Sequence, residues 1–290
     1  MRLFLIAWMV VLVAALVGCR GPGAADRPFP IGPEDEAAIG LAAAPRVEER
    51  WGGRMADPAV QAYVRTVGER LAQSVPARPS PFHFTVLESG GVHLFSLPGG
   101  MVYVTRGLLE KLRSEGELAG LLAHQLAHIG ARHSEDSGLA LLGGGALCEA
   151  AVAAGARTSG EPVSRADARS FEKVIALWVD KPYTPEMEIQ ADRLGLDYMV
   201  AAGYQPGEMV RLMNVMASME GQGAAEFLGL HPNPPDRASD IADIVGRKYL
   251  DRQGRVGRQE YEREVLERLR AEARAGPPGR PSPTGGQPQP

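Results

Sequence analysis

The sequence has little cysteine and no excess of positive charge, and both shortages exclude whole classes of protein. Only Cys19 and Cys148 occur among 290 residues, which is too few for a disulfide scaffold or for a metal site built from several thiolates. The formal net charge is -4, which argues against a nucleic-acid-binding protein. No repeat with a period of roughly 20 to 50 residues is visible, so we do not expect a helical-repeat domain.

What the sequence does have is the composition of a globular protein. Hydrophobic residues make up 44% of the chain and charged residues 23%. The 35 glycines and 23 prolines fall short of a low-complexity composition. A chain of this length can bury a sizeable core, so we expect one or two folded domains rather than global disorder.

The first residues have the pattern of a targeting segment. Arg2 precedes an almost unbroken apolar run, Leu3 to Val17, which is shorter than the about 20 residues that span a bilayer. The run leads to Cys19 through Leu-Val-Gly, which resembles the bacterial lipoprotein signal. We therefore expect residues 1–18 to be a signal peptide and Cys19 to carry the acyl chains that hold the protein on a membrane. A secretory signal that ends in a chance cysteine is the alternative.

Glycine and proline mark the two ends of the expected folded region. Residues 19–33 are typical of a lipidated tether, and residues 276–290, where ten of fifteen are Gly or Pro, are typical of a disordered tail. We assign residues 34–250 to the main domain. Residues 251–275 should form a C-terminal charged helix, in which the alternation of Glu and Arg is typical of a solvated face.

Capping signals and apolar spacing predict a mostly helical domain. Asp57, Ser114 and Thr184 each stand where an N-cap precedes helical spacing of apolar residues. Shorter apolar stretches between residues 83 and 105, interrupted at Pro98-Gly99-Gly100, predict a small sheet that contains a hairpin. The expected fold class is therefore α+β, mostly helical, with one small antiparallel sheet.

Two histidines four residues apart are the centre of the predicted chemistry. His124 and His128 belong to the helix that follows Ser114, so both imidazoles project from one face and can grip one zinc ion. On a second helix, Glu188 can be a third ligand. Asp192, one turn further on, can hold a liganding histidine in its tautomer. Two histidines and one carboxylate leave the fourth position of a tetrahedral zinc ion open, as in catalytic sites.

An ordered series of motifs extends from about Ile39 to Asp243. The motifs are Phe95-Ser96-Leu97-Pro98-Gly99-Gly100, Val102-Tyr103-Val104-Thr105-Arg106-Gly107-Leu108-Leu109, Glu117-Leu118-Ala119, His124 with His128, Arg132-His133, Glu188, Ala191-Asp192-Arg193 with Gly195, Ala202-Gly203-Tyr204, and His231-Pro232 with Arg237. With these motifs the chain resembles the M48 family of zinc metallopeptidases, in particular its bacterial envelope lipoproteins. The resemblance implies a zincin-like fold and one zinc ion held by His124, His128 and Glu188, with support from Asp192.

The resemblance also implies a substrate, a binding mode and a location. The family holds an extended peptide against an edge strand by main-chain hydrogen bonds. The matching residues are Val92, His93, Leu94 and Phe95. His231 is expected near the metal, where it occupies the fourth position or stabilises an oxyanion. The implied partners are extended or unfolded envelope polypeptides. The absence of Asp after Cys19 implies the periplasmic face of the outer membrane.

One position departs from the family in a way that concerns activity. The family motif His-Glu-x-x-His has Gln125 in place of its glutamate. That glutamate takes a proton from the zinc-bound water, whereas a glutamine amide has no basic lone pair at neutral pH. Loss of a general base typically costs about 10² to 10⁴ in rate. We therefore predict a pseudoprotease that binds extended chains. The alternative is a fully active zinc endopeptidase in which His231 or His133 supplies the base.

Overall fold

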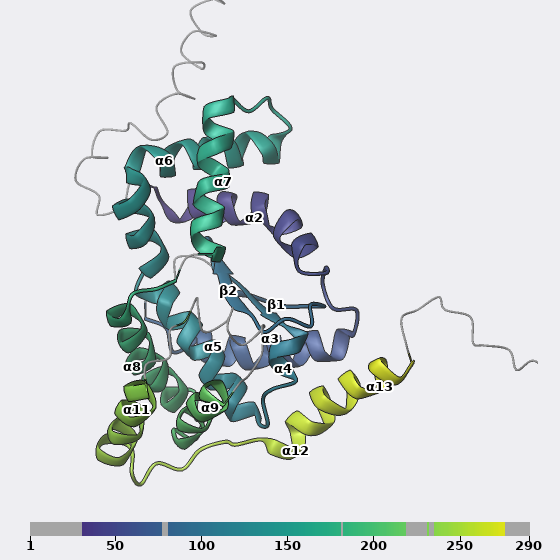
Figure 1. Ribbon diagram of the computed structural model, residues 1–290, viewed down its shortest axis with the longest axis vertical. Helices are drawn as coiled ribbons and strands as arrows, with labels where there is room; N and C mark the ends of the chain where they lie inside the picture. The colour runs from purple at the N-terminus through teal and green to yellow at the C-terminus, as the bar shows by residue number, and fades with distance from the viewer. Residues whose placement is uncertain (1–30, 77–80, 181, 219–230, 232–234, 276–290) are drawn as a thin grey trace, which may run out of the picture.

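Helices predominate in the part of the chain that the computed structural model describes, residues 31–76, 81–180, 182–218, 231 and 235–275 (Figure 1). The first half holds α2 (Pro33–Arg50), α3 (Pro58–Ala72), β1 (His83–Leu87), β2 (Leu94–Leu97), β3 (Met101–Thr105), α4 (Arg106–Leu109) and α5 (Glu115–Gly130). The second half holds α6 (His133–Ser159), α7 (Arg165–Asp180), α8 (Pro185–Ala201), α9 (Gly207–Ala217), α11 (Pro235–Lys248), α12 (Arg258–Tyr261), a π-helical turn η1 (Glu262–Leu266) and α13 (Glu267–Ala275). The predicted fold class, mostly helical with one small sheet, is confirmed.

The sheet is mixed, so the prediction of a purely antiparallel sheet was wrong. Its strand order is β1-β3-β2. β2 and β3 form the predicted antiparallel hairpin, whereas β1 pairs with β3 in parallel. Residues 88–100 lie between β1 and β3, about the dozen residues that a parallel connection needs. Apolar alternation tells which residues are buried but does not encode strand direction, and for this reason the sequence could not reveal the parallel pair.

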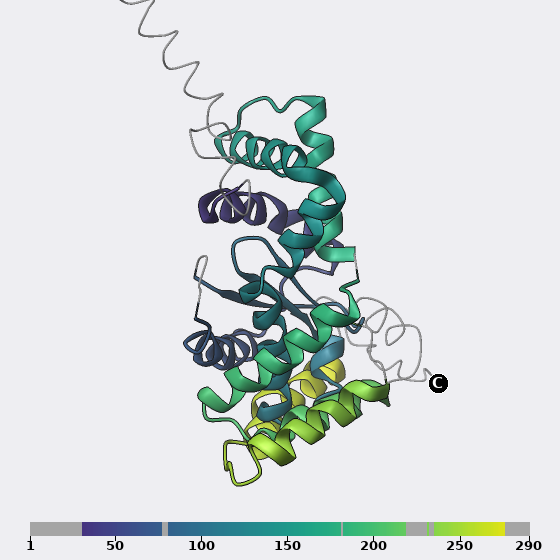
Figure 2. The same ribbon diagram turned by 90° about the vertical axis from the view of Figure 1, so that its left-hand side faces the viewer.

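The sheet lies between two layers of helices, each with its own apolar cluster (Figures 1 and 2). Phe95 and Tyr103 belong to the cluster shared with α2, α6 and α7. Leu94, Val102 and Val104 belong to the larger cluster on the opposite face, shared with α3, α5, α8, α9 and the C-terminal helices. Successive strand residues thus alternate between the layers, as the pleat of a strand requires.

The predicted helix starts are confirmed by their caps. The Asp57 side chain accepts hydrogen bonds from two backbone N–H groups of α3, and the Thr184 hydroxyl accepts one from α8. The Ser114 hydroxyl accepts the backbone N–H of Glu117 at 3.0 Å. Every residue of α5 from Glu115 to His128 is buried, which is the pattern of a helix that is enclosed on all sides. The helix that carries the two histidines is therefore held rigidly in the core.

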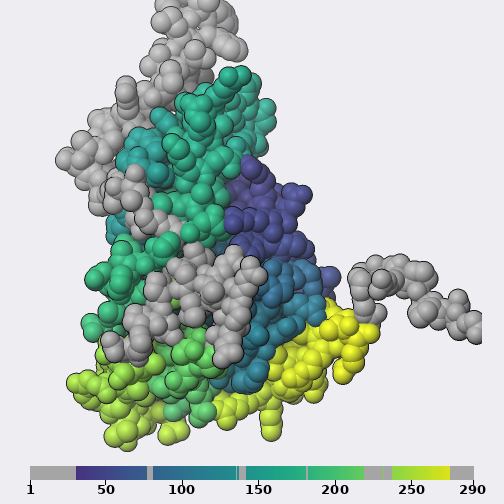
Figure 3. Space-filling model, viewed as in Figure 1, coloured from purple at the N-terminus to yellow at the C-terminus, as the bar shows by residue number. Residues whose placement is uncertain are grey.

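The C-terminal helices pack into the same large cluster as α5. Tyr261, Val265, Leu266 and Leu269 are buried there, while the charged residues between them lie outside. In the space-filling view, these C-terminal residues (yellow) lie against blue residues of the N-terminal half (Figure 3). In the charged segment predicted as residues 251–275, the helix thus begins at Arg258. One face of this segment is buried and the other is solvated.

Several predicted features lie outside the described residues. These are the signal peptide, the lipidated Cys19 and the tail 276–290. At the end of the predicted tether, Ile31 is buried in the cluster of α2, α6 and α7. Among the described residues, no helix has both the length and the apolar character that crossing a bilayer requires.

Candidate metal centre

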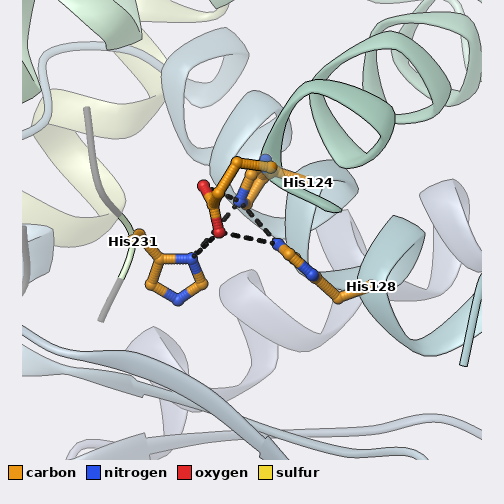
Figure 4. A group of neighbouring side chains, drawn as sticks. His124, His128 and His231 are labelled. Carbon is orange, nitrogen blue, oxygen red and sulfur yellow. Dashed lines mark hydrogen bonds and ion pairs between the residues drawn. The ribbon is translucent and has the colours of Figure 1, made fainter. Parts of the chain in front are cut away.

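Close packing of α8 on α5 brings the predicted site residues together. A Cβ atom on Gly195 would lie only 3.0 Å from the backbone nitrogen of His124, which is tighter than ordinary van der Waals contact, so glycine at this position favours the close approach of the two helices. Glu188 and Asp192 stand on α8 in the two turns before Gly195 and face α5. His231 enters from the other side, so that the imidazoles of His124, His128 and His231 point toward one another (Figure 4).

Four side chains meet at one point in the core. The Nε2 atoms of His124 and His128 are 3.1 Å apart. Glu188 Oε1 lies 3.3 Å from His128 Nε2, and Glu188 Oε2 lies 3.5 Å from His124 Nε2. His231 Nδ1 lies 3.1 Å from Glu188 Oε1 and 3.4 Å from His124 Nε2. The ligand-type atoms of the four residues all lie within 4.8 Å of one another.

The donor set and its spacing fit a zinc ion. Ligand atoms about 2.0 to 2.1 Å from a tetrahedral zinc ion stand about 3.3 Å from one another. The shortest separations here run from 3.1 Å to 3.5 Å, and all four ligand-type atoms lie within 4.8 Å of one another. Imidazole nitrogen and carboxylate oxygen are the donors that zinc takes in proteins. The described residues therefore include a buried group that could hold a metal ion.

A carboxylate fixes the orientation of His124. Its Nδ1 lies 2.9 Å from Asp192 Oδ1, and donation of the Nδ1 proton to this carboxylate leaves the Nε2 lone pair free to face the cluster. Arg237, buried at 2% exposure, donates to both oxygens of Asp192 at 2.7 Å and 2.8 Å. Burial alone would raise the pKa of Asp192, but the bonds from His124 and Arg237 outweigh it and lower that pKa below its ordinary value. Asp192 thus contacts His124, and its role in supporting a metal ligand stays a prediction.

His128 has a different set of neighbours, which the sequence did not predict. Its Nδ1 lies 2.9 Å from Nδ1 of His133, and its ring stacks on Tyr183 with the ring centroids 3.7 Å apart. His133 is close because α5 ends at Gly130 and Arg132, at φ 59, turns the chain back. The Arg132-His133 pair was a visible motif, but the turn that returns His133 to His128 depends on a left-handed conformation that is rare for arginine. Burial lowers the pKa of His128 well below its ordinary value, which favours the neutral imidazole that binds metals.

The Gln125 side chain is held by a hydrogen bond to β2. The side chain is fully buried, and its Nε2 donates to the Ser96 hydroxyl at 2.9 Å. Ser96 lies on β2 at a position whose side chain faces α5, as Leu94 does. The Oε1 atom of Gln125 is buried and has no hydrogen-bond partner among the described residues. The residue in the general-base position therefore connects α5 to the strand predicted to bind peptides.

The predicted peptide-binding strand lies at one edge of the sheet, with its side chains buried. Val92, His93, Leu94 and Phe95 are all 5% exposed or less, and among the described strands β2 pairs only with β3. His93 accepts the backbone N–H of Thr105. Because hydrogen-bonding directions alternate along an antiparallel strand, the backbone groups of Leu94 and Ser96 point away from β3. Any contact with a peptide must therefore use the main chain of β2 rather than these side chains.

Comparison with known proteins agrees with this geometry. The model of peptidase family M48 matches residues 58–245, well over half of the chain. A beta-barrel assembly-enhancing protease of Yersinia pestis is 29% identical over 63% of this chain, and a putative one of Vibrio cholerae is 30% identical over 63%. Metalloprotease YcaL of Escherichia coli is 25% identical over 61% of this chain and is itself covered over 70% of its length.

The chain spans less than two fifths of the length of the first two relatives, 38% and 39%. The residues matched by the family model include α5 and α8. The matched region also contains His124, His128, Glu188 and Asp192 at the spacing and in the contacts described above. On this evidence the chain belongs to peptidase family M48.

Proposed function

We propose that this chain is a zinc-binding M48 module that captures extended envelope polypeptides and has lost most or all of its peptidase activity. Gln125 carries the proposal. Its amide cannot accept a proton from a metal-bound water at neutral pH, and its Nε2 is already engaged by Ser96. A group in that state can hold a structure together but cannot act as a general base.

In the proposed site, His124, His128, Glu188 and His231 hold the zinc ion. Zinc that keeps an open position supplies a Lewis acid and lowers the pKa of its water to about 7. Four protein ligands instead form the closed arrangement of structural zinc sites. His231 Nδ1, which lies 3.1 Å from Glu188 Oε1, has the position of a ligand. Its placement argues against a free base at this residue, and cleavage by any variant requires that a water replace His231 at the zinc ion.

The proposed ligands are unfolded outer-membrane polypeptides. Two relatives carry the words beta-barrel assembly-enhancing in their names, and a β-barrel protein before assembly is an extended chain rich in strand-forming segments. Such a chain can add to the outer edge of β2 through main-chain hydrogen bonds, which tolerate many sequences. The location proposed for this activity is the bacterial envelope, with a lipid on Cys19 holding the domain at the periplasmic face of the outer membrane.

Cleavage of an unfolded protein by the zinc-loaded chain tests the proposal. We expect no cleavage, or a rate lower by about 10² to 10⁴ than that of the Gln125→Glu variant. This variant keeps the contact to β2, because the Ser96 hydroxyl can donate to a carboxylate. A variant that combines Gln125→Glu with His124→Ala controls for contaminating proteases. Equal rates for the native chain and Gln125→Glu would instead favour the active endopeptidase, and His231→Ala would then test the substitute base.

Binding is tested separately, with a labelled strand-forming peptide from an outer-membrane β-barrel protein. The matched control is the same peptide with every second backbone amide methylated, which removes the main-chain donors on one edge. We expect binding of the first peptide and at least about tenfold weaker binding of the second, since strand addition depends on these donors. Equal binding of both peptides would reject strand addition as the mode of capture.

A further inference from the structure

His128 is the first member of a chain of polar contacts that leads out of the metal centre. Its Nε2 faces Glu188 and His124, and its Nδ1 lies 2.9 Å from Nδ1 of His133. The other nitrogen of His133, Nε2, lies 2.9 Å from Oε1 of Gln190. His133 is 2% exposed, whereas Gln190, on α8, is exposed. The contacts therefore connect the buried centre with an amide at the surface.

Only one arrangement of protons makes this chain compatible with a metal ligand at His128. A neutral imidazole has one N–H and one lone pair, so a lone pair on Nε2 requires the proton to be on Nδ1. That proton must be donated to His133 Nδ1, which then has to be the acceptor. His133 consequently carries its own proton on Nε2, and this N–H needs an acceptor. The Gln190 oxygen stands at that position.

The reverse arrangement would prevent metal binding. If His133 carried its proton on Nδ1, it would donate to His128 Nδ1, and the His128 proton would be displaced to Nε2. An N–H would then point at Glu188 and His124, where the lone pair of a ligand is needed. The acceptor at the far end of the chain therefore selects which nitrogen of His128 is available to the metal.

We propose that His133 and Gln190 are positioning residues that fix the tautomer of His128 and so expose its Nε2 lone pair to the metal. The two metal histidines then have different supports. His124 donates to a carboxylate that Arg237 holds in place. His128 donates to a second imidazole, and that imidazole donates to an amide oxygen. The left-handed turn at Arg132 belongs to this support, because it brings His133 back beside α5.

This inference depends on the proposed zinc site for its consequence, but the tautomer can be measured without zinc. Nitrogen-15 NMR of the imidazole rings in the metal-free native chain should show the His128 proton on Nδ1. His133→Phe keeps a ring but removes the acceptor, and we expect the His128 signals to become those of a mixture of tautomers. His133→Asn places an amide oxygen near the former Nδ1 and should restore the native signals. The His124 signals, set by Asp192, should stay the same in all variants.

Zinc affinity, measured by competition with a chelator, gives the second readout. Loss of a residue that orients a metal ligand typically weakens binding by about 10- to 100-fold, and we expect this for His133→Phe. We expect a change of less than about 3-fold for His133→Asn and for His83→Phe, which replaces a histidine exposed on β1. A Gln190→Met variant should weaken zinc binding less than His133→Phe, because water can reach this exposed end of the chain.

The outcomes separate the two proposals. If the His128 proton stays on Nδ1 and zinc binds equally well in His133→Phe, the positioning role is rejected. A purely structural role of His133 would lower the stability of the variant without changing the tautomer, and that result also rejects it. If the native chain binds no zinc but the tautomer changes as expected, the positioning role stands and the proposed zinc site fails.

Discussion

Two buried carboxylates on neighbouring helices, Glu115 and Glu188, have opposite surroundings. Glu115, at the start of α5, is 2% exposed and accepts hydrogen bonds from two arginines and two tyrosines. Arg255 contributes two bonds, at 2.6 Å and 2.8 Å, and the other donors are Arg70, Tyr63 and Tyr204. Glu188, on α8, is fully buried and faces three imidazoles as well as Arg237.

The comparison teaches what distinguishes a structural carboxylate from one that could bind a metal ion. Arginine and tyrosine donate hydrogen bonds, so both oxygens of Glu115 are satisfied without a metal ion. Neutral imidazoles bring lone pairs as well as protons. The nitrogens of His124 and His128 that meet beside Glu188 are 3.1 Å apart, and two lone pairs that face each other at this distance favour binding of a cation between them. Glu115 therefore ties helices together, while Glu188 completes a site.

The largest expected effect is on stability, at Glu115. Its removal in Glu115→Ala should lower the free energy of unfolding by about 3 kcal/mol, the lower end of the range for breaking a buried ion pair. The lower end applies because the side chains of Arg70 and Arg255 are 38% and 43% exposed and regain water. Urea denaturation measures the loss. Asp243→Ala, which breaks an exposed pair with Arg247, is the matched control and should cost less than about 0.5 kcal/mol.

Zinc should stabilise the native chain. It should do so through the group of side chains around Glu188 and not through the contacts of Glu115. At a free zinc concentration about 100 times the dissociation constant, the free energy of unfolding should rise by about 2.7 kcal/mol. We expect the rise to be abolished in His128→Ala and kept in Glu115→Ala, although the latter starts from lower stability. Thermal unfolding with and without zinc measures both. A zinc effect that survives His128→Ala would place the metal elsewhere.

Asp192 should matter for zinc affinity. In Asp192→Asn, the carboxylate that accepts from His124 and pairs with Arg237 loses its charge, and we expect zinc to bind about 10- to 100-fold more weakly. Chelator competition gives the dissociation constants. Asp197→Asn is the matched control, because Asp197 stands on the same helix in an exposed pair with Lys248. If the two variants bind zinc equally well, Asp192 does not support His124 in the way the contacts indicate.

The sequence predicted which side chains of α5 and α8 come together better than it predicted what surrounds them. Spacing on α5 was enough for His124 and His128, because a helix brings residues four apart onto one face. Glu188 and Asp192 followed from the same rule on α8. The contact between His133 and His128 could not be predicted in this way, since it depends on Arg132 adopting a positive φ.

The Glu115 cluster was not predicted at all. Its donors come from residues 63, 70, 204 and 255, which are far apart in the chain and follow no spacing rule. The same reason explains the parallel pairing of β1 with β3, which long-range packing decides. Local periodicity fixed helix starts such as the N-cap at Ser114, whereas contacts between distant segments became visible only in the structure.

The smallest expected effect is on the pH dependence of stability that Glu115 contributes. Burial would raise the pKa of Glu115, but the bonds from Arg255, Tyr63 and Tyr204 outweigh it and lower the pKa below the ordinary value of 4.5. A carboxyl group with a lowered pKa stabilises the fold above its unfolded-state pKa and loses this contribution as the pH falls through its folded-state pKa. The difference in unfolding free energy between the native chain and Glu115→Gln should therefore be constant near neutral pH.

Below about pH 4.5 this difference should shrink, by at most about 1.4 kcal/mol per pH unit. The neighbours of Glu115 do not titrate in that range, because arginine stays charged and the pKa values of Tyr63 and Tyr204 are raised further. Other buried carboxyls, such as Glu36 and Glu117, have raised pKa values, but they are present in both proteins and cancel in the difference. Urea denaturation of the metal-free proteins at several pH values between about 3 and 7 measures this difference in unfolding free energy. A difference that stays constant down to pH 3 would mean that Glu115 is not held as a carboxylate by its arginines.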